Sequence, residues 1–182
     1  MKSCCISRIT AKLLQEALNI SRRVLGEEHR NTLLSMSGLA DIYLDLGRLD
    51  DAETLDRDAL EVQRRVLGKE HPDTLGTMNG LADVYMSQGR YDEADRLFGE
   101  TLHGMRRVLG DDHPDTASPI YGLGCVAALR RERGKALDWL RQAVEHGFRD
   151  ADEMAKDPNL RSLQGDPAFE ALVARARKNA GR

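Results

Sequence analysis

A stretch of eleven residues that occurs three times constrains the fold of this chain more than any other feature. It reads RRVLGEEHRNT at residues 22–32, RRVLGKEHPDT at 64–74 and RRVLGDDHPDT at 106–116, so each copy begins 42 residues after the last. The similarity extends further, because residues 22–63 match residues 64–105 at 21 of 42 positions. A fixed period of this size is typical of stacked-repeat proteins. We therefore expect a repeat array, which grows by stacking units rather than around one central core.

Within the first full period, residues 27–68, the apolar residues follow helical spacing. The turn at Gly47 separates a helix over about residues 32–46 from a second helix over about 51–67. The stripe that this spacing places on one side of the first helix is Leu33, Met36, Leu39, Ala40 and Tyr43.

The next two periods repeat this helix-turn-helix pattern over about residues 69–110 and 111–147. In the second, Pro72 begins one helix and the other runs from about Asp92 to Leu109. In the third, the pattern predicts a turn displaced to Gly134 and a short helix from about Lys135 to His146. The sequence thus predicts an all-α fold.

The two ends depart from the repeat. Residues 1–26 contain a single helix, over about 9–25, whose apolar positions align with those of the second helix of a unit. We therefore expect a half-repeat that lacks its first helix.

Residues 148–182 break the period and predict a helical cap over the last unit. A short helix stops at Pro158, and Asp166 caps a last helix over about 168–178. We expect Trp139 to pack beneath this cap. The apolar residues expected to anchor the cap are Leu160, Leu163, Phe169, Leu172, Val173 and Ala176.

The pattern Leu-Ala-x-x-Tyr-x-x-x-Gly-Arg-x-x-x-Ala, which begins at Leu39 and again at Leu81, resembles the tetratricopeptide repeat. The 42-residue period and the Gly-x-x-His-Pro-Asp-Thr linker resemble the repeats of kinesin light chain and its bacterial relatives. HEAT repeats have a similar period but lack this pattern. The resemblance implies a right-handed superhelix of helix pairs, an α-solenoid, and the tail is similar to the segment that closes many bacterial tetratricopeptide arrays. The third unit departs from the pattern with Ala127 for the tyrosine and Arg131 for the turn glycine.

Composition excludes several classes of function. The formal net charge is −3, so the chain as a whole does not attract nucleic acid or an anionic membrane. No apolar run approaches the roughly 20 residues of a membrane span, and residues 1–10 lack the apolar stretch of a signal peptide. We therefore expect a cytoplasmic protein.

The residues that most often carry chemistry are not arranged for it. Cys4, Cys5 and Cys125 fit neither a disulfide framework nor a zinc site, and we expect free thiols. The histidines of the repeated stretch lie in separate units, so they predict linker positions rather than ligands of one metal. We expect no catalytic residue, no metal site and no cofactor, and hence a non-enzymatic protein.

Binding of a partner protein is the function that the resemblance implies, because the first helices of stacked units line a concave groove. Asn79 occupies the position at which kinesin-light-chain-like repeats hold a peptide backbone, and Asp41 and Asp83 recur at one repeat position. The acids predict a basic peptide with apolar anchors, although a solvated helix face would explain them equally well. The repeat register predicts a groove lined by Leu34, Ser37, Asp41, Leu44, Asp45, Gly76, Asn79, Asp83, Met86, Ser118, Tyr121 and Cys125.

Two other surfaces suggest functions other than peptide binding in the groove. The unpartnered first helix exposes Leu13, Leu14 and Ala17, so the natural chain is longer, or residues 1–8 fold back, or two chains pair as a homodimer. The paired arginines of the repeated stretch could form a phosphate-binding ridge. Their place in the last turn of a helix favours a structural role beside the helix dipole.

Overall fold

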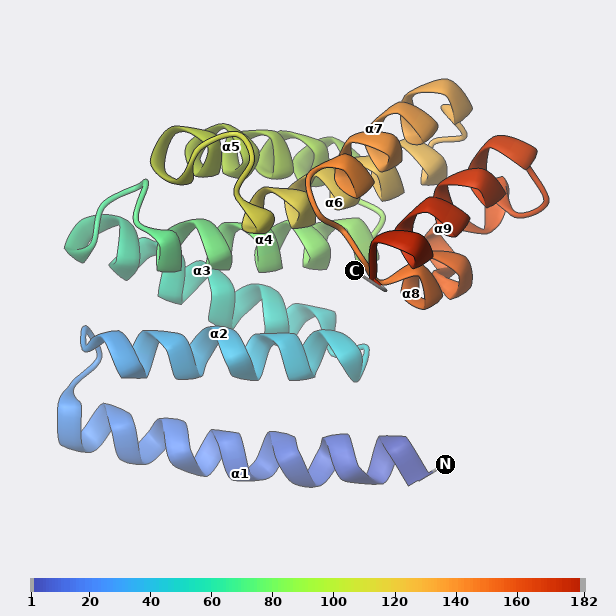
Figure 1. Ribbon diagram of the computed structural model, residues 1–182. Coiled ribbons are helices and arrows are strands. Elements are labelled where there is room, and N and C mark those ends of the chain that lie inside the picture. Colours follow the sequence, from blue (N-terminus) through green and yellow to red (C-terminus); the bar gives the residue numbers. More distant parts are fainter. Residues whose placement is uncertain (1, 181–182) are drawn as a thin grey trace. The chain divides into compact units, whose positions relative to one another are not determined.

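The computed structural model describes residues 2–180 of the chain, and the side chains of residues 9–180. Within these residues every regular element is a helix, which confirms the all-α prediction (Figure 1). The chain divides into two compact units, Met1–Arg90 and Tyr91–Arg182, which are described separately below.

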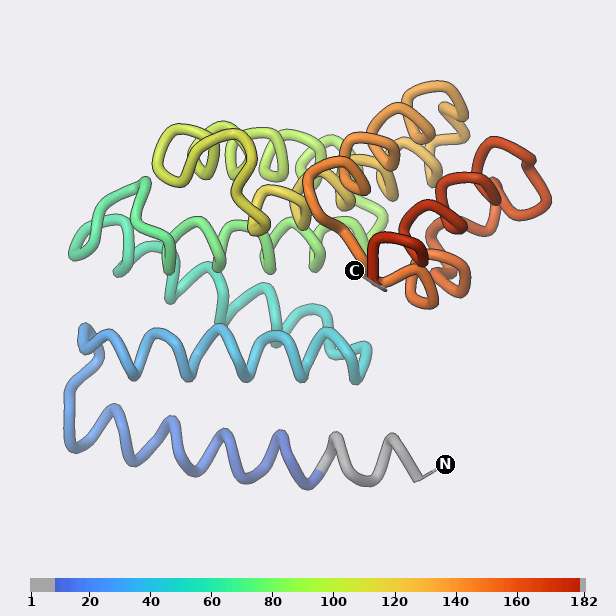
Figure 2. The backbone as a smooth tube through the Cα atoms, viewed as in Figure 1, coloured from blue at the N-terminus to red at the C-terminus, as the bar shows by residue number. Residues whose placement is uncertain are grey.

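The first unit contains four helices that follow one another side by side (Figure 2). Each packs against the next, and α2 also contacts α4. Small and branched apolar residues fill the space between them, and Leu18, Leu39 and Ala52 are wholly buried. The helices are α1 (Lys2–Leu25), α2 (Arg30–Asp45), α3 (Leu49–Val66) and α4 (Pro72–Ser87).

The second unit is built around α6, in which 11 of 13 residues are buried. Helices α5 and α7 and the 3-10 helix η2 all pack against α6, while α9 packs against α7 and α8. The residues predicted to anchor the cap are buried, which confirms that part of the prediction. The elements are α5 (Tyr91–Leu109), η1 (Pro114–Thr116), α6 (Ala117–Leu129), α7 (Arg133–Glu145), α8 (Ala151–Lys156), η2 (Pro158–Leu163) and α9 (Pro167–Ala180).

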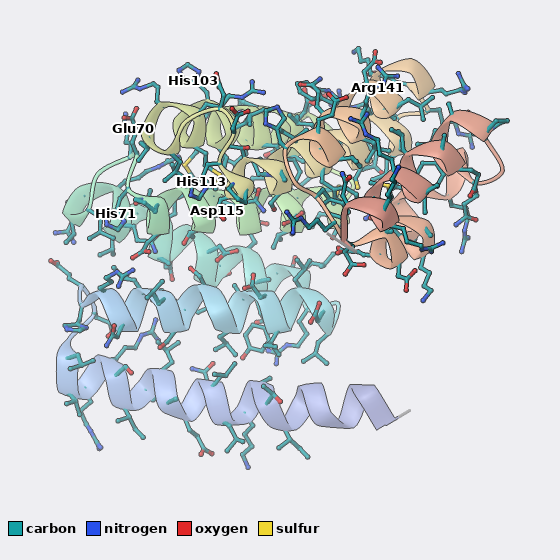
Figure 3. All side chains as sticks on the ribbon, in the orientation of Figure 1. Glu70, His71, His103, His113, Asp115 and Arg141 are labelled. Carbon is teal, nitrogen blue, oxygen red and sulfur yellow. The ribbon has the colours of Figure 1, made fainter. Side chains whose placement is uncertain are left out.

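The histidines of the repeated stretch begin helices. Nδ1 of His29, His71 and His113 accepts a hydrogen bond from the backbone N–H two residues later, at 3.2, 3.1 and 3.3 Å. Figure 3 labels two of these residues, His71 at the start of α4 and His113 at the start of η1. The hydroxyls of Thr32 and Thr74 donate to the carbonyl of the glycine that ends the preceding helix, both at 2.8 Å. The stretch is therefore a helix-linking motif, in which each side chain satisfies a backbone group that the helix end leaves open.

Three of the paired arginines lie beside nearby acids. Arg22 lies 3.0 Å from Glu27, Arg65 lies 2.8 Å from Glu28, and Arg106 lies 3.5 Å from Asp111. These ion pairs agree with the structural role that the helix dipole favours.

The predicted turn at Gly134 is wrong, because the chain turns at Arg131. Arg131 has φ +61°, the left-handed conformation that Gly47 and Gly89 adopt at φ +71° and +77°. Arg131 N–H donates to the Ala128 carbonyl, as Gly47 N–H does to Leu44, at 3.0 and 2.9 Å. The turn therefore keeps its place in the repeat, at the steric cost that a side chain brings to this conformation.

The position predicted for Trp139 is also wrong. Trp139 is half-buried and lines an open cavity of about 630 Å³ among α5, α6 and α7, and no residue of the cap contributes to this cavity. Helix α7 buries Ala136, Leu137 and Leu140, and Trp139 lies to one side of that stripe.

The first helix begins at Lys2, before the predicted start at residue 9. The side chains of Cys4 and Cys5, and the alternative in which residues 1–8 fold back, lie outside the side chains that the structure describes.

Candidate protein-interaction surfaces

Helices α2 and α4 are adjacent in the first unit, and two polar contacts join them. The hydroxyls of Ser37 and Thr77 lie 2.8 Å apart, and Arg30 Nη2 donates to Asp73 Oδ1 at 2.9 Å. The arginine holds the pKa of the Asp73 carboxyl below its usual range. The two helices therefore present one continuous face.

The predicted groove residues of this unit differ in exposure. Leu34, Asp41 and Asp45 are exposed, with Leu34 at 40%. Gly76 is also exposed. Four of the predicted groove residues are half-buried, namely Ser37, Leu44, Asn79 and Asp83. Two of the apolar ones belong largely to the interior, since Leu44 packs against the core and Met86 is only 8% exposed.

A carboxylate that the sequence analysis did not include lies beneath this face. Asp56 of α3 is only 1% exposed, and its Oδ1 has no hydrogen-bond partner. Its Oδ2 lies 3.3 Å, and Asp41 Oδ1 lies 3.6 Å, from the point where a Cβ on Gly80 would be. Because glycine leaves that point empty, acids from α2 and α3 converge on the backbone of α4.

The pKa values of Asp41 and Asp56 are both raised, and each of these residues lies near other acids. Burial, followed by the charges of Asp41 and Asp83, raises the pKa of Asp56 to about 8. Partial removal from water and the neighbouring Asp45 raise the pKa of Asp41. Among the side chains of residues 9–180, no basic group forms an ion pair with Asp41 or Asp56. We call Asp41, Asp56 and Asp83 the carboxylate cluster.

The repeat itself contained a signal for Asp56. Leu14, Asp56, Phe98 and Leu140 follow one another at intervals of 42 residues, and only Asp56 is polar. Phe98 and Leu140 are wholly buried, and Leu14 packs against the core. A charged residue at a position that is otherwise apolar is therefore the feature that could have revealed the cluster.

Two of the predicted groove residues of the second unit contact residues of the C-terminal segment, 148–182. The Tyr121 hydroxyl donates to Asp157 Oδ2 at 2.7 Å, and its ring stacks on Phe148 with centroids 4.3 Å apart. Cys125 is 1% exposed and lies 3.5 Å from the same carboxylate oxygen. Burial raises the pKa of Tyr121. These two side chains are covered within the chain, whereas Ser118 is exposed at the start of α6.

Comparison with known proteins decides the family. The sequence profile of the tetratricopeptide repeat matches residues 11–65, 36–102 and 73–146. The chain belongs to the tetratricopeptide repeat family. Repeats of this family are generally non-enzymatic modules that mediate contacts between proteins.

Solved structures agree with this assignment at the level of the fold. The kinesin light chain TPR-like repeats of Podosopora anserina are 23% identical, with a TM-score of 0.69, over 95% of this chain and 86% of that one. BtubC (BKLC) of P. vanneervenii is 22% identical, with a TM-score of 0.71, over 96% of this chain and 73% of that one. No curated protein matches the chain in sequence.

The first helix of this tetratricopeptide array forms a second candidate surface. Leu13 is 60% exposed and Ala17 is also exposed, but Leu14 packs against the core. The predicted self-association residues therefore lie on two sides of α1. Other apolar residues extend the exposed side, namely Ile9, Ile20 and Val24, which are 62%, 55% and 68% exposed.

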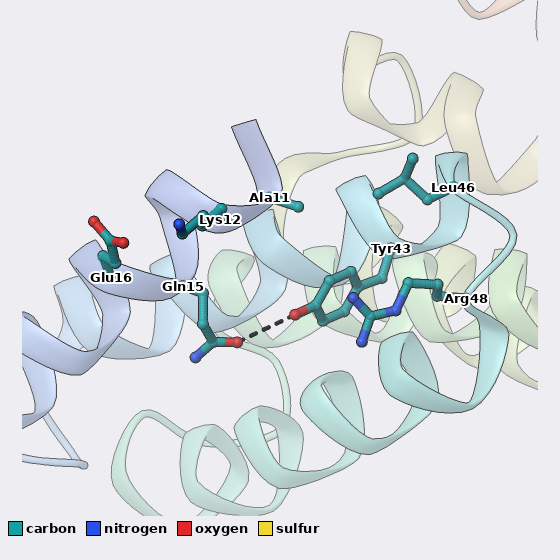
Figure 4. A pocket seen from close by; sticks show the side chains of 7 residues that line it. All are labelled: Ala11, Lys12, Gln15, Glu16, Tyr43, Leu46 and Arg48. Carbon is teal, nitrogen blue, oxygen red and sulfur yellow. Dashed lines mark hydrogen bonds between the residues drawn. The ribbon is translucent and has the colours of Figure 1, made fainter. Parts of the chain in front are cut away.

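An open cavity of about 580 Å³ lies beside α1 (Figure 4). The Tyr43 hydroxyl donates to Gln15 Oε1 at 3.2 Å, and the Arg48 guanidinium lies 4.0 Å from the centre of the Tyr43 ring. Arg90 stacks on Tyr85 at the same 4.0 Å, so this contact is a feature of the repeat rather than of a ligand site. The lining residues are Ala11, Lys12, Gln15, Glu16, Tyr43, Leu46 and Arg48.

Within the part that the structure describes, no group of His, Cys, Asp or Glu side chains is placed to hold a metal ion. No helix in the same residues combines the length and the apolar character needed to cross a bilayer.

Proposed function

We propose that this tetratricopeptide protein binds an extended segment of a partner protein along the face of α2 and α4. The observation that carries the proposal is that these adjacent helices combine an exposed apolar side chain, Leu34, with the half-buried amide of Asn79 and the acids beside it. An amide both donates and accepts hydrogen bonds, which suits the backbone of an extended peptide. The acids favour a basic segment with apolar anchors.

The proposal is tested with peptides selected from a random dodecapeptide library displayed on phage. We expect selected peptides to bind Leu34→Ala/Asn79→Ala at least about tenfold more weakly than the wild type, as loss of an anchor and a backbone contact predicts. The matched control is Val66→Ala/Asn19→Ala, which removes a 45%-exposed valine and an exposed asparagine from other helices. Equal binding to all three proteins, or selection of no peptide, would reject this surface.

Self-association is a second candidate function, and the exposed side of α1 favours it. Leu55 and Val62 of α3 pack against the core, whereas Leu13 and Ile20, one period earlier, are 60% and 55% exposed. A second copy of this chain, pairing through its own α1, would cover that side with the same chemistry. Light scattering of the wild type and of Leu13→Glu/Ile20→Glu tests this candidate. A dimer that dissociates in the variant supports it, and a monomeric wild type rejects it.

We also infer that the chain has no catalytic role. The expected cytoplasmic location and the repeat boundaries remain predictions.

A further inference from the structure

We infer that the carboxylate cluster of the first unit receives the ammonium group of one lysine side chain from the partner. This inference rests on the proposed function, because it names a side chain that the face of α2 and α4 recognises. It depends on Asp56, a buried residue of α3 that is not among the groove residues predicted from the repeat register.

The first step of the argument is that Asp56 is not a solvated surface acid. It is 1% exposed, and Oδ1 has no hydrogen-bond partner, although buried polar atoms are nearly always paired. An unpaired buried acceptor lowers the free energy of unfolding, and does so more when it is charged. The first unit therefore maintains an acceptor that its own described side chains do not satisfy.

The second step is that the other oxygen of the same carboxyl group, Oδ2, lies beside the backbone of α4. Asp56 Oδ2 and Asp41 Oδ1 lie 3.3 and 3.6 Å from the empty Cβ position of Gly80, and Gly80 is half-buried. Asp41 is exposed and Asp83 is half-buried, so the acids extend from the interior to the surface. The absent side chain of Gly80 therefore leaves unfilled a position that lies beside both carboxyl groups.

The third step concerns the charge of the ligand. The ionisable groups that face Asp56 are Asp41 from α2 and Asp83 from α4, and both are acids. A cation is the ligand that removes repulsion among the three and allows Asp56 to ionise. Binding of a cation therefore releases a proton at any pH at which Asp56 is protonated in the free protein.

The fourth step distinguishes lysine from the other cations. An ammonium group is a compact charge with three donors, which can donate to more than one carboxylate at once. A guanidinium is a planar fork that matches a single carboxylate edge. The described residues offer no metal-binding group, so a divalent ion is not favoured.

The test measures the pKa of Asp56 by carbon-13 NMR of its carboxyl, with n-butylammonium chloride as the probe of a lysine side chain. We expect the pKa to fall by about one unit at a probe concentration about ten times its dissociation constant. Tetramethylammonium, which has no N–H donor, should leave the pKa unchanged at equal ionic strength. Propylguanidinium should act more weakly than butylammonium.

Two glycine variants provide a matched pair. Gly80→Ala places a methyl group 3.3 Å from Asp56 Oδ2, whereas Gly76→Ala, one turn earlier on α4, meets no atom within 4 Å. Both replace a helical glycine by alanine and so change helix propensity equally. We expect Gly80→Ala to remove the response to butylammonium and Gly76→Ala to keep it.

The inference is overturned if butylammonium leaves the pKa of Asp56 unchanged in the folded protein, if tetramethylammonium acts equally, or if only calcium chloride lowers it. None of these results depends on the phage selection. A response to butylammonium without any selected peptide would reject the peptide surface and keep the lysine site. Selected peptides whose lysine can be replaced by norleucine without loss would reject the lysine site and keep the peptide surface.

Discussion

Asp56 and Phe98 occupy the same repeat position in the two units, and each lies against a glycine of the following helix. In the second unit the Phe98 ring is wholly buried and reaches 2.5 Å from the Cβ position of Gly122. In the first unit the Asp56 carboxyl lies 3.3 Å from the corresponding position of Gly80. A glycine at the same repeat position therefore leaves room for an aromatic ring in one unit and for a carboxyl group in the other.

The comparison shows that a repeat position fixes burial but not chemistry. Phe98 gains the free energy of removing apolar surface from water, while Asp56 at the same depth loses hydration without a partner. The first unit thus gives up stability at a site where its neighbour gains it. Such a loss is typical of functional positions, where local stability and ligand recognition have opposing requirements.

The largest effect is expected for Phe98→Ala. Removal of a wholly buried ring should lower the free energy of unfolding of the second unit by about 3–5 kcal/mol, because a cavity remains beside Gly122. Urea unfolding followed by fluorescence of Trp139, the one tryptophan of the chain, measures this. Val108→Ala, at a 44%-exposed position of the same helix, is the control and should have little effect. A loss below about 1 kcal/mol would contradict the contribution assigned to the ring.

Asp56→Leu is expected to act in the opposite direction and to depend on pH. The pKa of Asp56 is about 8 in the folded protein against the ordinary 3.8, so between these values the folded state holds a proton that the unfolded state has lost. Stability from this group is present below pH 3.8 and is lost as pH rises to about 8. The variant should therefore be more stable than the wild type at pH 8, by on the order of 2–4 kcal/mol. The gain in the free energy of unfolding should be smaller at pH 5.

Circular dichroism in urea at the two pH values measures this difference. Asp58→Leu, at an exposed position of the same helix, is the control for replacing an aspartate of α3 by leucine. A gain of equal size at pH 5 and pH 8 would show that Asp56 does not titrate in this range.

The two glycines should respond differently to alanine. Gly122→Ala puts a methyl group 2.5 Å from a ring that is 0% exposed, so the ring or the helix must shift, at a cost of about 1–3 kcal/mol. Gly80→Ala meets carboxylate oxygens at 3.3 and 3.6 Å, and its gain of about 1 kcal/mol in helix propensity should largely offset those contacts. Thermal unfolding of both variants tests this order, and equal losses would remove the distinction between the two sites.

The smallest effect is expected at the turns. Arg131→Gly should stabilise the second unit by about 0.5–1 kcal/mol, because it relieves a left-handed residue at φ +61°. The reverse change in the first unit, Gly89→Arg at φ +77°, should destabilise by a similar amount. Matched urea titrations report both, and a loss of stability in Arg131→Gly would show that the arginine side chain contributes more than its strain costs.

Much of the fold could be predicted from the sequence because stacked repeats depend on local spacing. The 42-residue period placed Leu33, Leu39 and Tyr43 on one side of a helix, and all three are buried. The anchors Leu160 and Leu163 were predicted by the same helical reasoning.

The remaining features depend on contacts that spacing does not encode. Arg131 has no sequence mark of a left-handed turn, and the hydrogen bonds of the preceding helix impose its conformation. The side of α7 on which Trp139 lies is decided by packing against its neighbours, which the sequence spacing does not encode. Asp56 was not predicted as a site residue, because the groove residues were taken from the first helix of each repeat. Asp56 lies on the second helix of its repeat.

The helix-capping histidines have a consequence for their chemistry. A backbone N–H donates to Nδ1 of His29, His71 and His113, so the lone pair of that nitrogen is occupied. The ring hydrogen of the neutral imidazole must then be on Nε2, and all three rings share one tautomer. A neutral imidazole in this state has no lone pair to offer a metal ion. Each histidine could become a metal ligand only by releasing the start of the helix that it caps.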